Sequence, residues 1–258
     1  MTADDRAAAL GRRGLTAAAL GSLVLGGCDR LSSDPAVQGW LDSASRLSLL
    51  VQHWLAGNAL AREYTEADIT GSFKGNGTVD PDDDDYQAHA ANGFAEWKLQ
   101  VDGLVARPGQ YSLADLRAMK ARTQITRHDC VEGWSCIGKW KGVPLAEILE
   151  RVEPKAAARF AVFHCADPME NGNPATKYYE SIDLIEAVHP QTILAYEMND
   201  AVLPVAHGAP LRLRVERQLG YKMAKYVMRI EFVEDFRSIG GGRGGYWEDQ
   251  GYAWYAGI

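Results

Sequence analysis

The sequence predicts an α+β domain in which mixed β-sheets are accompanied by short helices. Short runs of alternating or continuous apolar residues recur along the chain, which is typical of strands. Short amphipathic segments lie between some of these runs, but strands and helices do not alternate regularly as they do in βαβ units. The sequence also shows no internal repeat. Together these observations favour mixed sheets.

The regular part of the main domain begins with a strand over Trp97–Val101, whose apolar and polar residues alternate up to the turn Asp102-Gly103. Ser112–Asp115 has the form of a capping box, which predicts that a short helix starts there and continues through Met119. A further strand is predicted over Gln124–His128.

Pro144 is expected in the first turn of the next helix, because its missing N–H has no intrahelical partner at that position. The apolar face of this helix would consist of Leu145, Ile148, Leu149 and Val152. Another short helix is predicted from Ser181 to before Pro190. Four further strands are predicted over Phe160–His164, Ile193–Met198, Leu211–Val215 and Tyr226–Val233.

The first 28 residues have the features of an export signal. Arg12-Arg13 precedes an apolar run over Gly14–Gly27, which is shorter than the roughly 20 residues that a membrane-spanning helix needs. The paired arginines resemble a twin-arginine signal. The run ends at Leu25–Cys28, which resembles a lipobox, so a lipid on Cys28 and a periplasmic location are expected. Asp29 would favour retention at the inner membrane. The alternative is a helical N-terminal segment with an incidental cysteine.

Residues 29–67 are expected to form a helical segment and a linker, because Pro35–Leu60 carries apolar residues at helical spacing. Residues 68–258 would form the main domain. The acidic run Asp80–Asp85 lacks the spacing of a calcium loop and is expected to be a solvated loop.

Composition excludes several classes of function. The chain has 258 residues, of which 47% are hydrophobic and 24% charged, as in ordinary globular proteins. Its formal net charge of −7 argues against binding to nucleic acid. Four cysteines are too few for a disulfide scaffold, and no C-x-x-C pair occurs, so a zinc knuckle is not expected.

The candidate site centres on Cys130, which follows a predicted strand and lies in a glycine-containing loop. A thiol in such a place can bind a metal or act as a nucleophile, although most free cysteines are simply small buried side chains. Three cationic or ionisable residues, His207, Arg212 and Lys225, lie in glycine-rich stretches and could bind an anionic ligand together with Cys130. A cysteine hydrolase is disfavoured, because the nearby His128 is only two residues away and is expected on the same strand face.

Several motifs resemble the sulfite oxidase family of molybdopterin enzymes, in the family's order, from about Asp68 to the C-terminus. They are W-x-L-x-V-x-G-L-V (97–105), C-V-E-G-W-S (130–135), W-x-G-V-P-L (140–145), H-G-A-P-L-R-L (207–213), G-Y-K-M-A-K-Y (220–226) and G-Y-W-E-x-x-G-Y (245–252). The resemblance implies that a molybdenum ion is bound by the ene-dithiolate of one molybdopterin and by the thiolate of Cys130. Soft sulfur ligands suit that role.

The resemblance also implies roles for other residues. His207 and Arg212 match the segment that binds the pterin phosphate, and Tyr252 matches an active-site tyrosine close to the metal. The remaining implied cofactor contacts are Asn76, Cys165, Lys225 and the backbone of Met223 and Ala224.

Two departures bear on the substrate. Trp134 and Gly75 occupy positions where sulfite oxidases carry arginines for the sulfite anion. The C-V-E-G-W-S form is more similar to the bacterial branch that contains the periplasmic methionine sulfoxide reductase catalytic subunit. The resemblance therefore implies oxygen-atom transfer, with reduction of a small-molecule S- or N-oxide. The alternatives are a sulfite dehydrogenase and, in another class, a cofactor-free anion-binding module.

The resemblance has implications for assembly as well. No stretch is left for a C-terminal immunoglobulin-like domain or a built-in haem domain, so a monomer is expected. It would exchange electrons with a separate partner, such as a membrane haem protein or cytochrome. Whether Cys136 and Cys165 form a disulfide is open at this stage.

Overall fold

The computed structural model describes residues 37, 40, 47, 49–51, 59–170 and 173–258. The chain divides into two compact units, residues 1–55 and residues 56–258. In the first unit the described residues are helical, whereas Ala59 and Leu60, which belong to the second unit, are not. The expected export signal and the lipid site at Cys28 lie outside the described residues. No helix in the described part of the chain has the length and apolar content needed to cross a bilayer.

The first sheet of the second unit has five strands in the order β2-β1-β10-β5-β6. Strands β1 and β10 run parallel, while the other neighbours are antiparallel, so the sheet is mixed as the sequence predicted. The strands are β1 (Lys98–Gly103), β2 (Gly109–Ser112), β5 (Phe160–Pro168), β6 (Lys177–Asp183) and β10 (Val227–Val233).

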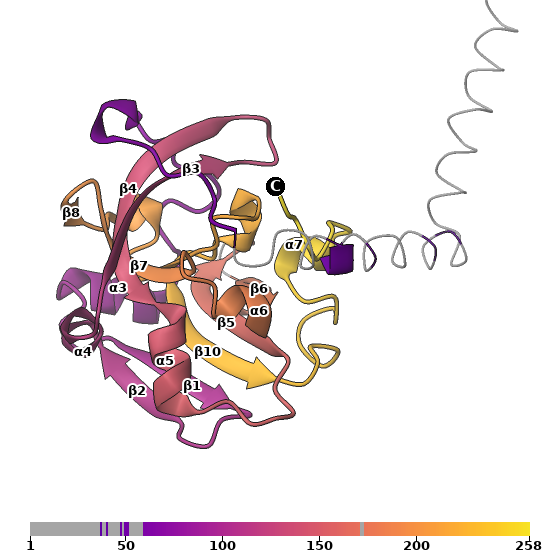
Figure 1. Ribbon diagram of the computed structural model, residues 1–258. Coiled ribbons are helices and arrows are strands. Elements are labelled where there is room, and N and C mark those ends of the chain that lie inside the picture. Colours follow the sequence, from indigo (N-terminus) through magenta and orange to yellow (C-terminus); the bar gives the residue numbers. More distant parts are fainter. Residues whose placement is uncertain (1–36, 38–39, 41–46, 48, 52–58, 171–172) are drawn as a thin grey trace, which may run out of the picture. The chain divides into compact units, whose positions relative to one another are not determined.

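The second sheet is antiparallel and is dominated by a long hairpin of two strands, β3 and β4 (Figure 1). Its order is β3-β4-β7-β8, and β9 also pairs with β7. The strands are β3 (Arg122–Asp129), β4 (Ser135–Pro144), β7 (Ile193–Met198), β8 (Ala201–Val202) and β9 (Arg212–Arg214).

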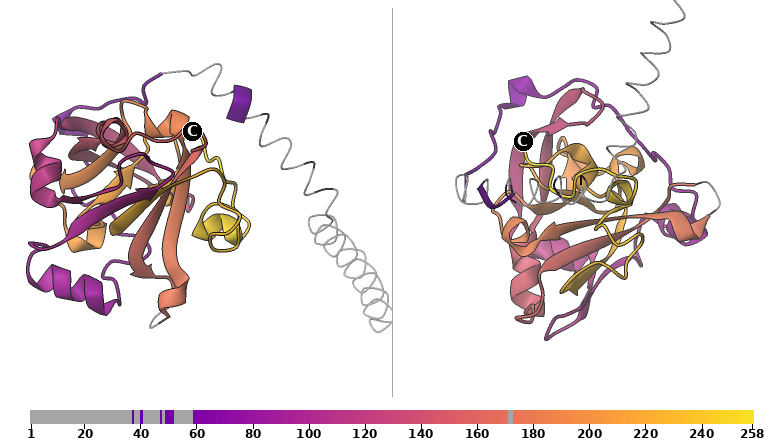
Figure 2. Two further views of the ribbon diagram at one scale, coloured as in Figure 1. Left: turned by 90° about the horizontal axis from the view of Figure 1, so that it is seen from below. Right: turned by 90° about the vertical axis from the view of Figure 1, so that its right-hand side faces the viewer.

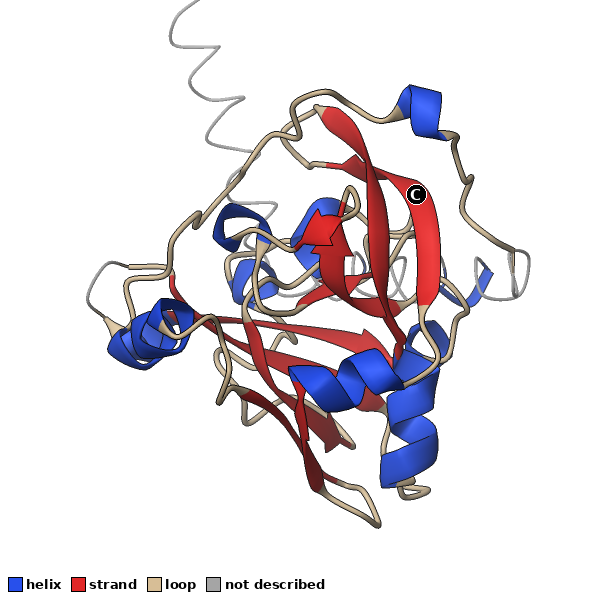
Figure 3. Ribbon diagram, turned by 90° about the vertical axis from the view of Figure 1, so that its left-hand side faces the viewer, coloured by secondary structure: helices blue, strands red, loops and turns tan. Residues whose placement is uncertain are grey.

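The helices are short and lie around the two sheets (Figure 3). The α-helices are α3 (Asp84–Ala91), α4 (Leu113–Ala118), α5 (Leu145–Val152), α6 (Leu184–Ala187) and α7 (Tyr246–Asp249). Four 3₁₀ turns are η1 (Glu66–Asp68), η2 (Pro174–Thr176), η3 (Val205–His207) and η4 (Gly220–Lys222).

Pro144, expected in the first turn of α5, is instead its N-cap and the last residue of β4. Helix α4 forms for the reason that the sequence indicated. The Ser112 hydroxyl accepts a hydrogen bond from the Asp115 N–H at 3.1 Å, and the Asp115 carboxylate accepts from the Ser112 N–H at 2.8 Å. Helix α5 buries the predicted apolar face. These residues join the main hydrophobic core, which also takes Leu99 and Val101 from β1 and Trp97, the residue before that strand.

Three further local predictions were wrong. The helix predicted from Ser181 starts only at Leu184, because residues up to Asp183 pair with β5 and the Asp183 carboxylate caps Glu186 N–H at 2.8 Å. Strand β4 begins at Ser135, inside the stretch predicted as a loop. Helix α3 begins within the acidic run, where the Asp83 carboxylate caps Tyr86 N–H at 3.0 Å.

The segment before α3 is held against the sheets by its backbone. Tyr64 N–H donates to the carbonyl of Ile125 at 2.8 Å, and Thr70 N–H donates to that of Ile137 at 3.0 Å. Further on, the Lys225 ammonium donates to the carbonyl of Asn76 at 2.9 Å. These contacts fix the position of Asn76 near the end of the β3–β4 hairpin.

After β10 the described chain forms only α7 and irregular segments, which run beside β6 to Ile258 (Figure 2). The described residues therefore contain no immunoglobulin-like sandwich, in agreement with the predicted fold class.

Gly142 provides a stability test of the second sheet. It lies at a β-bulge between β4 and β7, and a Cβ there would be 2.6 Å from the Cα of Ala195. We expect Gly142→Ala to lower the free energy of unfolding by about 1–3 kcal/mol, because this close backbone contact cannot relax. Urea unfolding would measure the loss. Gly71→Ala is the control, since no atom lies within 4 Å of its Cβ position; equal stability of the two variants would contradict the explanation.

Candidate functional site

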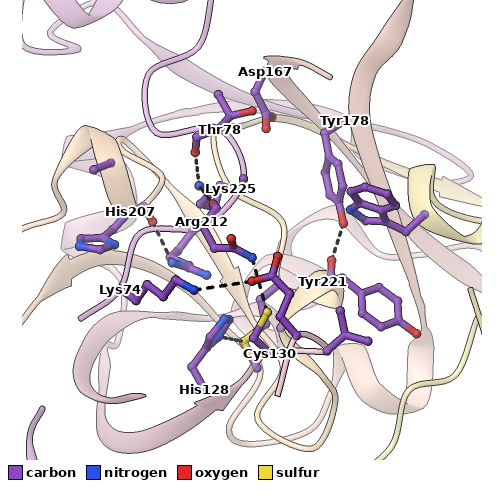
Figure 4. Close-up of a pocket in the computed structure, with 18 of the residues that line it drawn as sticks. Lys74, Thr78, His128, Cys130, Asp167, Tyr178, His207, Arg212, Tyr221 and Lys225 are labelled. Atoms are coloured by element: carbon purple, nitrogen blue, oxygen red, sulfur yellow. Dashed lines mark hydrogen bonds and ion pairs between the residues drawn. The ribbon is translucent and has the colours of Figure 1, made fainter. Parts of the chain in front are cut away.

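Cys130 lies in the turn that joins β3 to β4. Its N–H donates to the Trp134 carbonyl at 2.9 Å, and the Gly133 N–H donates back to the Cys130 carbonyl at 3.0 Å. Gly133 has a φ of +85°, a conformation that favours glycine. The Cys130 thiol is half-buried, and its sulfur lies 3.5 Å from the donor Nδ2 of Asn76 (Figure 4). The turn therefore presents one thiol, with an amide donor, to the space beside the hairpin.

That space is a cavity of about 300 Å³. Seven of the predicted site residues line it, although they come from segments far apart in the sequence: Asn76, Cys130, His207, Arg212, Met223, Lys225 and Tyr252. The structure therefore brings the thiol, the cationic residues and the C-terminal tyrosine to one place.

Cys165 and Ala224 do not line the cavity. Cys165 is buried in the main hydrophobic core, and burial raises the pKa of its thiol well above the ordinary value. The Ala224 carbonyl accepts a hydrogen bond from Leu213 N–H at 2.8 Å. Cys136 and Cys165 are both free thiols, so no disulfide joins them.

The cationic part of the cavity consists of Arg212 and Lys225. Burial and the neighbouring Arg214 lower the pKa of Arg212 to about 9, and burial and Arg212 lower that of Lys225 to about 8, so both remain mainly charged at neutral pH. Arg212 Nη1 donates to the His207 carbonyl at 2.9 Å, but its buried Nε has no hydrogen-bond partner among the described residues. An unpartnered buried donor of this kind suits an anionic ligand.

The two histidines beside these cations are neutral. Burial lowers the pKa of His207, and the charges of Arg212 and Lys225 add to the effect. Burial and Arg214 lower the pKa of His128 well below its usual range. Nη1 of Arg214 donates to Nδ1 of His128 at 3.0 Å, so Nδ1 is occupied as an acceptor. Nδ1 of His128 therefore cannot accept the proton of the Cys130 thiol, as the general base of a cysteine hydrolase would have to. This disfavours a hydrolase.

Asp167 and Tyr178 are among the polar residues of the cavity that were not predicted. Asp167 is 4% exposed, its Oδ1 has no partner among the described residues, and burial raises its pKa to about 7. Tyr178 donates a hydrogen bond to the Tyr221 carbonyl. Both side chains reach the cavity through the long-range pairing of β5 with β6, for which the sequence carries no local signal. Figure 4 shows Arg212 and Lys225 between Cys130 and Asp167.

The side of the cavity next to Cys130 has a different character. Lys74 and Glu132 form an exposed ion pair at 3.7 Å, and the Trp134 indole N–H donates to Glu132 at 2.9 Å. The Lys74 ammonium lies 4.9 Å from the centre of the Trp134 ring. The carboxylate and the indole therefore compensate the charge of Lys74.

These residues fit a cofactor that brings its own metal ligands. Among the described residues, no group of three or more His, Cys, Asp or Glu side chains could hold a metal ion. The protein offers one soft ligand, Cys130, and a cationic region with an unpartnered guanidinium nitrogen. A metal bound there needs further ligands from an organic, anionic group.

The comparisons with known proteins agree with this chemistry. The family described as "oxidoreductase molybdopterin binding domain" matches residues 87–238, more than half of the chain. The chain is 39% identical over 240 residues to the "putative protein-methionine-sulfoxide reductase subunit YedZ1" of Azospira oryzae, covering 92% of this chain and 84% of that protein.

Two relatives are named "protein-methionine-sulfoxide reductase catalytic subunit MsrP". The one from Ralstonia nicotianae is 39% identical over 145 residues, and the one from Xanthomonas campestris is 38% identical over 148 residues. The matches cover 54% and 55% of this chain but only 44% and 46% of those proteins. The sulfane dehydrogenase SoxCD of Paracoccus pantotrophus, a solved structure, aligns at a TM-score of 0.49 with 21% identity, over 55% of this chain and 39% of its own.

The resemblance inferred from the motifs is thus confirmed, and so is the predicted α+β fold. The chain belongs to the molybdopterin-binding oxidoreductases of the sulfite oxidase family, in the branch that contains the methionine sulfoxide reductase catalytic subunits.

Proposed function

We propose that this enzyme reduces sulfoxides with a molybdenum–molybdopterin cofactor bound in the cavity beside Cys130. The observation that carries the proposal is the single thiol on one side of a cavity whose other residues include two cations, the buried Arg212 and the half-buried Lys225. The names of the methionine sulfoxide reductase relatives support the choice of substrate.

Each part of the cofactor has a suitable partner. Cys130 would supply the protein's thiolate to molybdenum, and Arg212, Lys225 and His207 would bind the phosphate. The unpartnered Oδ1 of Asp167 could accept a hydrogen bond from an N–H of the cofactor. When bound, the molybdenum group supplies the two-electron chemistry of oxygen-atom transfer.

The protein's own side chains bind and orient the substrate. Asn76 donates a hydrogen bond to the Cys130 sulfur at 3.5 Å and so helps to orient this side chain. Tyr252 lines the same cavity, is 40% exposed, and carries a phenol that can donate a hydrogen bond to a sulfoxide oxygen. It is the candidate for positioning the substrate oxygen.

The surroundings of Cys130 favour a neutral substrate. Sulfite is an anion, but the cation on this side, Lys74, is already paired with Glu132. Val131 and Trp134 add apolar surface. A sulfoxide is uncharged and carries apolar groups on its sulfur, so it is accommodated without a further cation. The sulfite dehydrogenase alternative is disfavoured for this reason, and a cofactor-free anion-binding module would not need Cys130.

The proposal includes export and an external source of electrons. The twin-arginine motif at Arg12-Arg13 and the lipobox ending at Cys28 support a periplasmic enzyme anchored by lipid to the inner membrane. We propose that a separate membrane haem protein or cytochrome delivers electrons to a monomeric catalytic subunit.

The metal ligand can be tested by substitution. Protein purified from a host that makes molybdopterin is expected to contain about one molybdenum per chain, because the cavity offers one protein thiolate. Cys130→Ser should lose most of this metal. Cys136→Ser is the matched control, since Cys136 is a free but buried thiol in β4, and it should keep the metal. Stoichiometric zinc, or full molybdenum in Cys130→Ser, would refute the assignment.

The substrate can be tested with the same protein. With a reduced dye as electron donor, methionine sulfoxide should be consumed by the wild type, while Cys130→Ser should be at least about a hundredfold slower, as is common when a metal ligand shell is damaged. Sulfite oxidation with an oxidised dye should be slow at low substrate concentration. Efficient sulfite turnover would overturn the preference for sulfoxides.

The buried Asp167 should make stability pH-dependent. Its pKa is raised from 3.8 to about 7, so the folded protein holds a proton that the unfolded chain has lost, and stability falls as the pH rises through that range. Asp167→Asn removes this effect. In cofactor-free protein, the difference in free energy of unfolding between Asp167→Asn and the wild type should shift in favour of the variant by more than about 1 kcal/mol from pH 5 to pH 8. The exposed Asp82→Asn is the control; a pH-independent difference for Asp167→Asn would contradict the prediction.

A further inference from the structure

Three charged side chains are buried together behind one wall of the cavity. Lys222, from η4, is 0% exposed and donates hydrogen bonds to Glu180 of β6 and, at 2.6 Å, to Glu248 of α7. The side chains of Glu180 and Glu248 are 0% and 1% exposed. We call these three residues the buried triad.

The buried triad holds one lysine and two carboxyl groups. Burial and the neighbouring Glu248 raise the pKa of Glu180 well above its usual range, although Lys222 opposes this. The Ser181 N–H also donates to Glu180 at 2.7 Å. Removing one member of such a buried group leaves an unpaired charge in the protein interior, which strongly destabilises the folded state. The three segments that carry the triad are therefore held together.

Aromatic residues of the cavity lie next to the triad in the sequence. Tyr221 precedes Lys222, Trp247 precedes Glu248, and Tyr178 is two residues before Glu180. These three and Tyr252 all line the cavity, and we call them the aromatic wall.

The members of the aromatic wall contact one another. Trp247 stacks on Tyr252 with ring centres 5.3 Å apart, and Tyr221 meets the same ring edge-on at 5.3 Å. Tyr178 donates to the backbone carbonyl of Tyr221. Moving the segment that carries Glu248 would thus disturb the ring of Tyr252.

The C-terminal segment has little regular secondary structure of its own. Besides the triad, it contacts the rest of the unit through the isolated bridge between Gln218 and Gly257 and through a hydrogen bond from Trp254 Nε1 to the Ser181 hydroxyl at 2.8 Å. Helix α7 has four residues, and the chain around it pairs with β6 through one isolated bridge, between Glu180 and Gly245. A Cβ on Gly245 would lie 2.9 Å from the Glu180 carboxylate, so the close approach of the two segments depends on this glycine. Short elements with few backbone contacts open easily.

We propose that Lys222, Glu180 and Glu248 are positioning residues that hold the aromatic wall against the cavity, where it contacts the apolar groups on the substrate sulfur. Aromatic rings bind such sulfur-attached groups favourably. The role in substrate binding rests on the proposed sulfoxide reduction, whereas the anchoring of the C-terminal segment does not.

The test uses the full-length protein loaded with cofactor. In Lys222→Met and in the isosteric Glu248→Gln, amide hydrogen exchange of peptides from residues 245–258 should become about tenfold faster, because the segment opens more often. The control is Asp102→Asn, which disturbs a half-buried ion pair with Arg229 of the first sheet; neither residue lines the cavity. This variant should exchange like the wild type in that segment.

Kinetics then test the connection to substrate. Glu248→Gln should raise KM for a sulfoxide about tenfold with kcat less affected, since binding to the wall is weakened while the metal site is intact. Its molybdenum content should equal that of the wild type. Unchanged exchange in both variants, or equal acceleration in Asp102→Asn, would overturn the anchoring role. Faster exchange with an unchanged KM would overturn the substrate role, and absence of sulfoxide turnover in the wild type would instead refute the proposed function.

Discussion

The site depends on one buried guanidinium, that of Arg214. It is fully buried, forms a two-pronged ion pair with Glu216 at 2.9 and 2.6 Å, and donates to His128 at 3.0 Å. It also lies 4.4 Å from the centre of the Trp140 ring. These contacts join β9 to the β3–β4 hairpin. Because residues two apart on a strand share a face, Arg212 then points to the same side as Arg214, toward the cavity that Cys130 also lines.

This arrangement gives the cavity two electrostatic environments. Arg212 and Lys225 are charged and the neighbouring histidines are neutral, so these two residues supply the positive charge of their side of the cavity. Beside Cys130, Glu132 compensates Lys74. An anionic cofactor is therefore attracted to one side, while a neutral substrate is favoured at the other. The carboxyl of Asp167 has a raised pKa for the same physical reason: burial opposes any charge without a close partner.

Much of the strand pattern could be predicted, because alternation and apolar runs are local properties; β7, for instance, has the predicted bounds. The segments carrying Cys130, His207, Arg212 and Tyr252 were identifiable from short motifs. Cys165 was less predictable, because β5 is buried along most of its length and the sequence does not show which face meets the cavity. The sequence also did not indicate the roles of Asp167 or of Lys222 and its two carboxylate partners. These roles depend on residues that only folding brings together.

The central claim is that Cys130 binds the metal of the cofactor, and thiol alkylation followed by mass spectrometry tests it most directly. Among the described cysteines, Cys130 is half-buried while Cys136 and Cys165 are buried. A maleimide should therefore modify Cys130 first in cofactor-free protein. In cofactor-loaded protein the account predicts that Cys130 is protected, with Cys136 and Cys165 unchanged. Equally rapid modification of Cys130 in both forms would contradict the account.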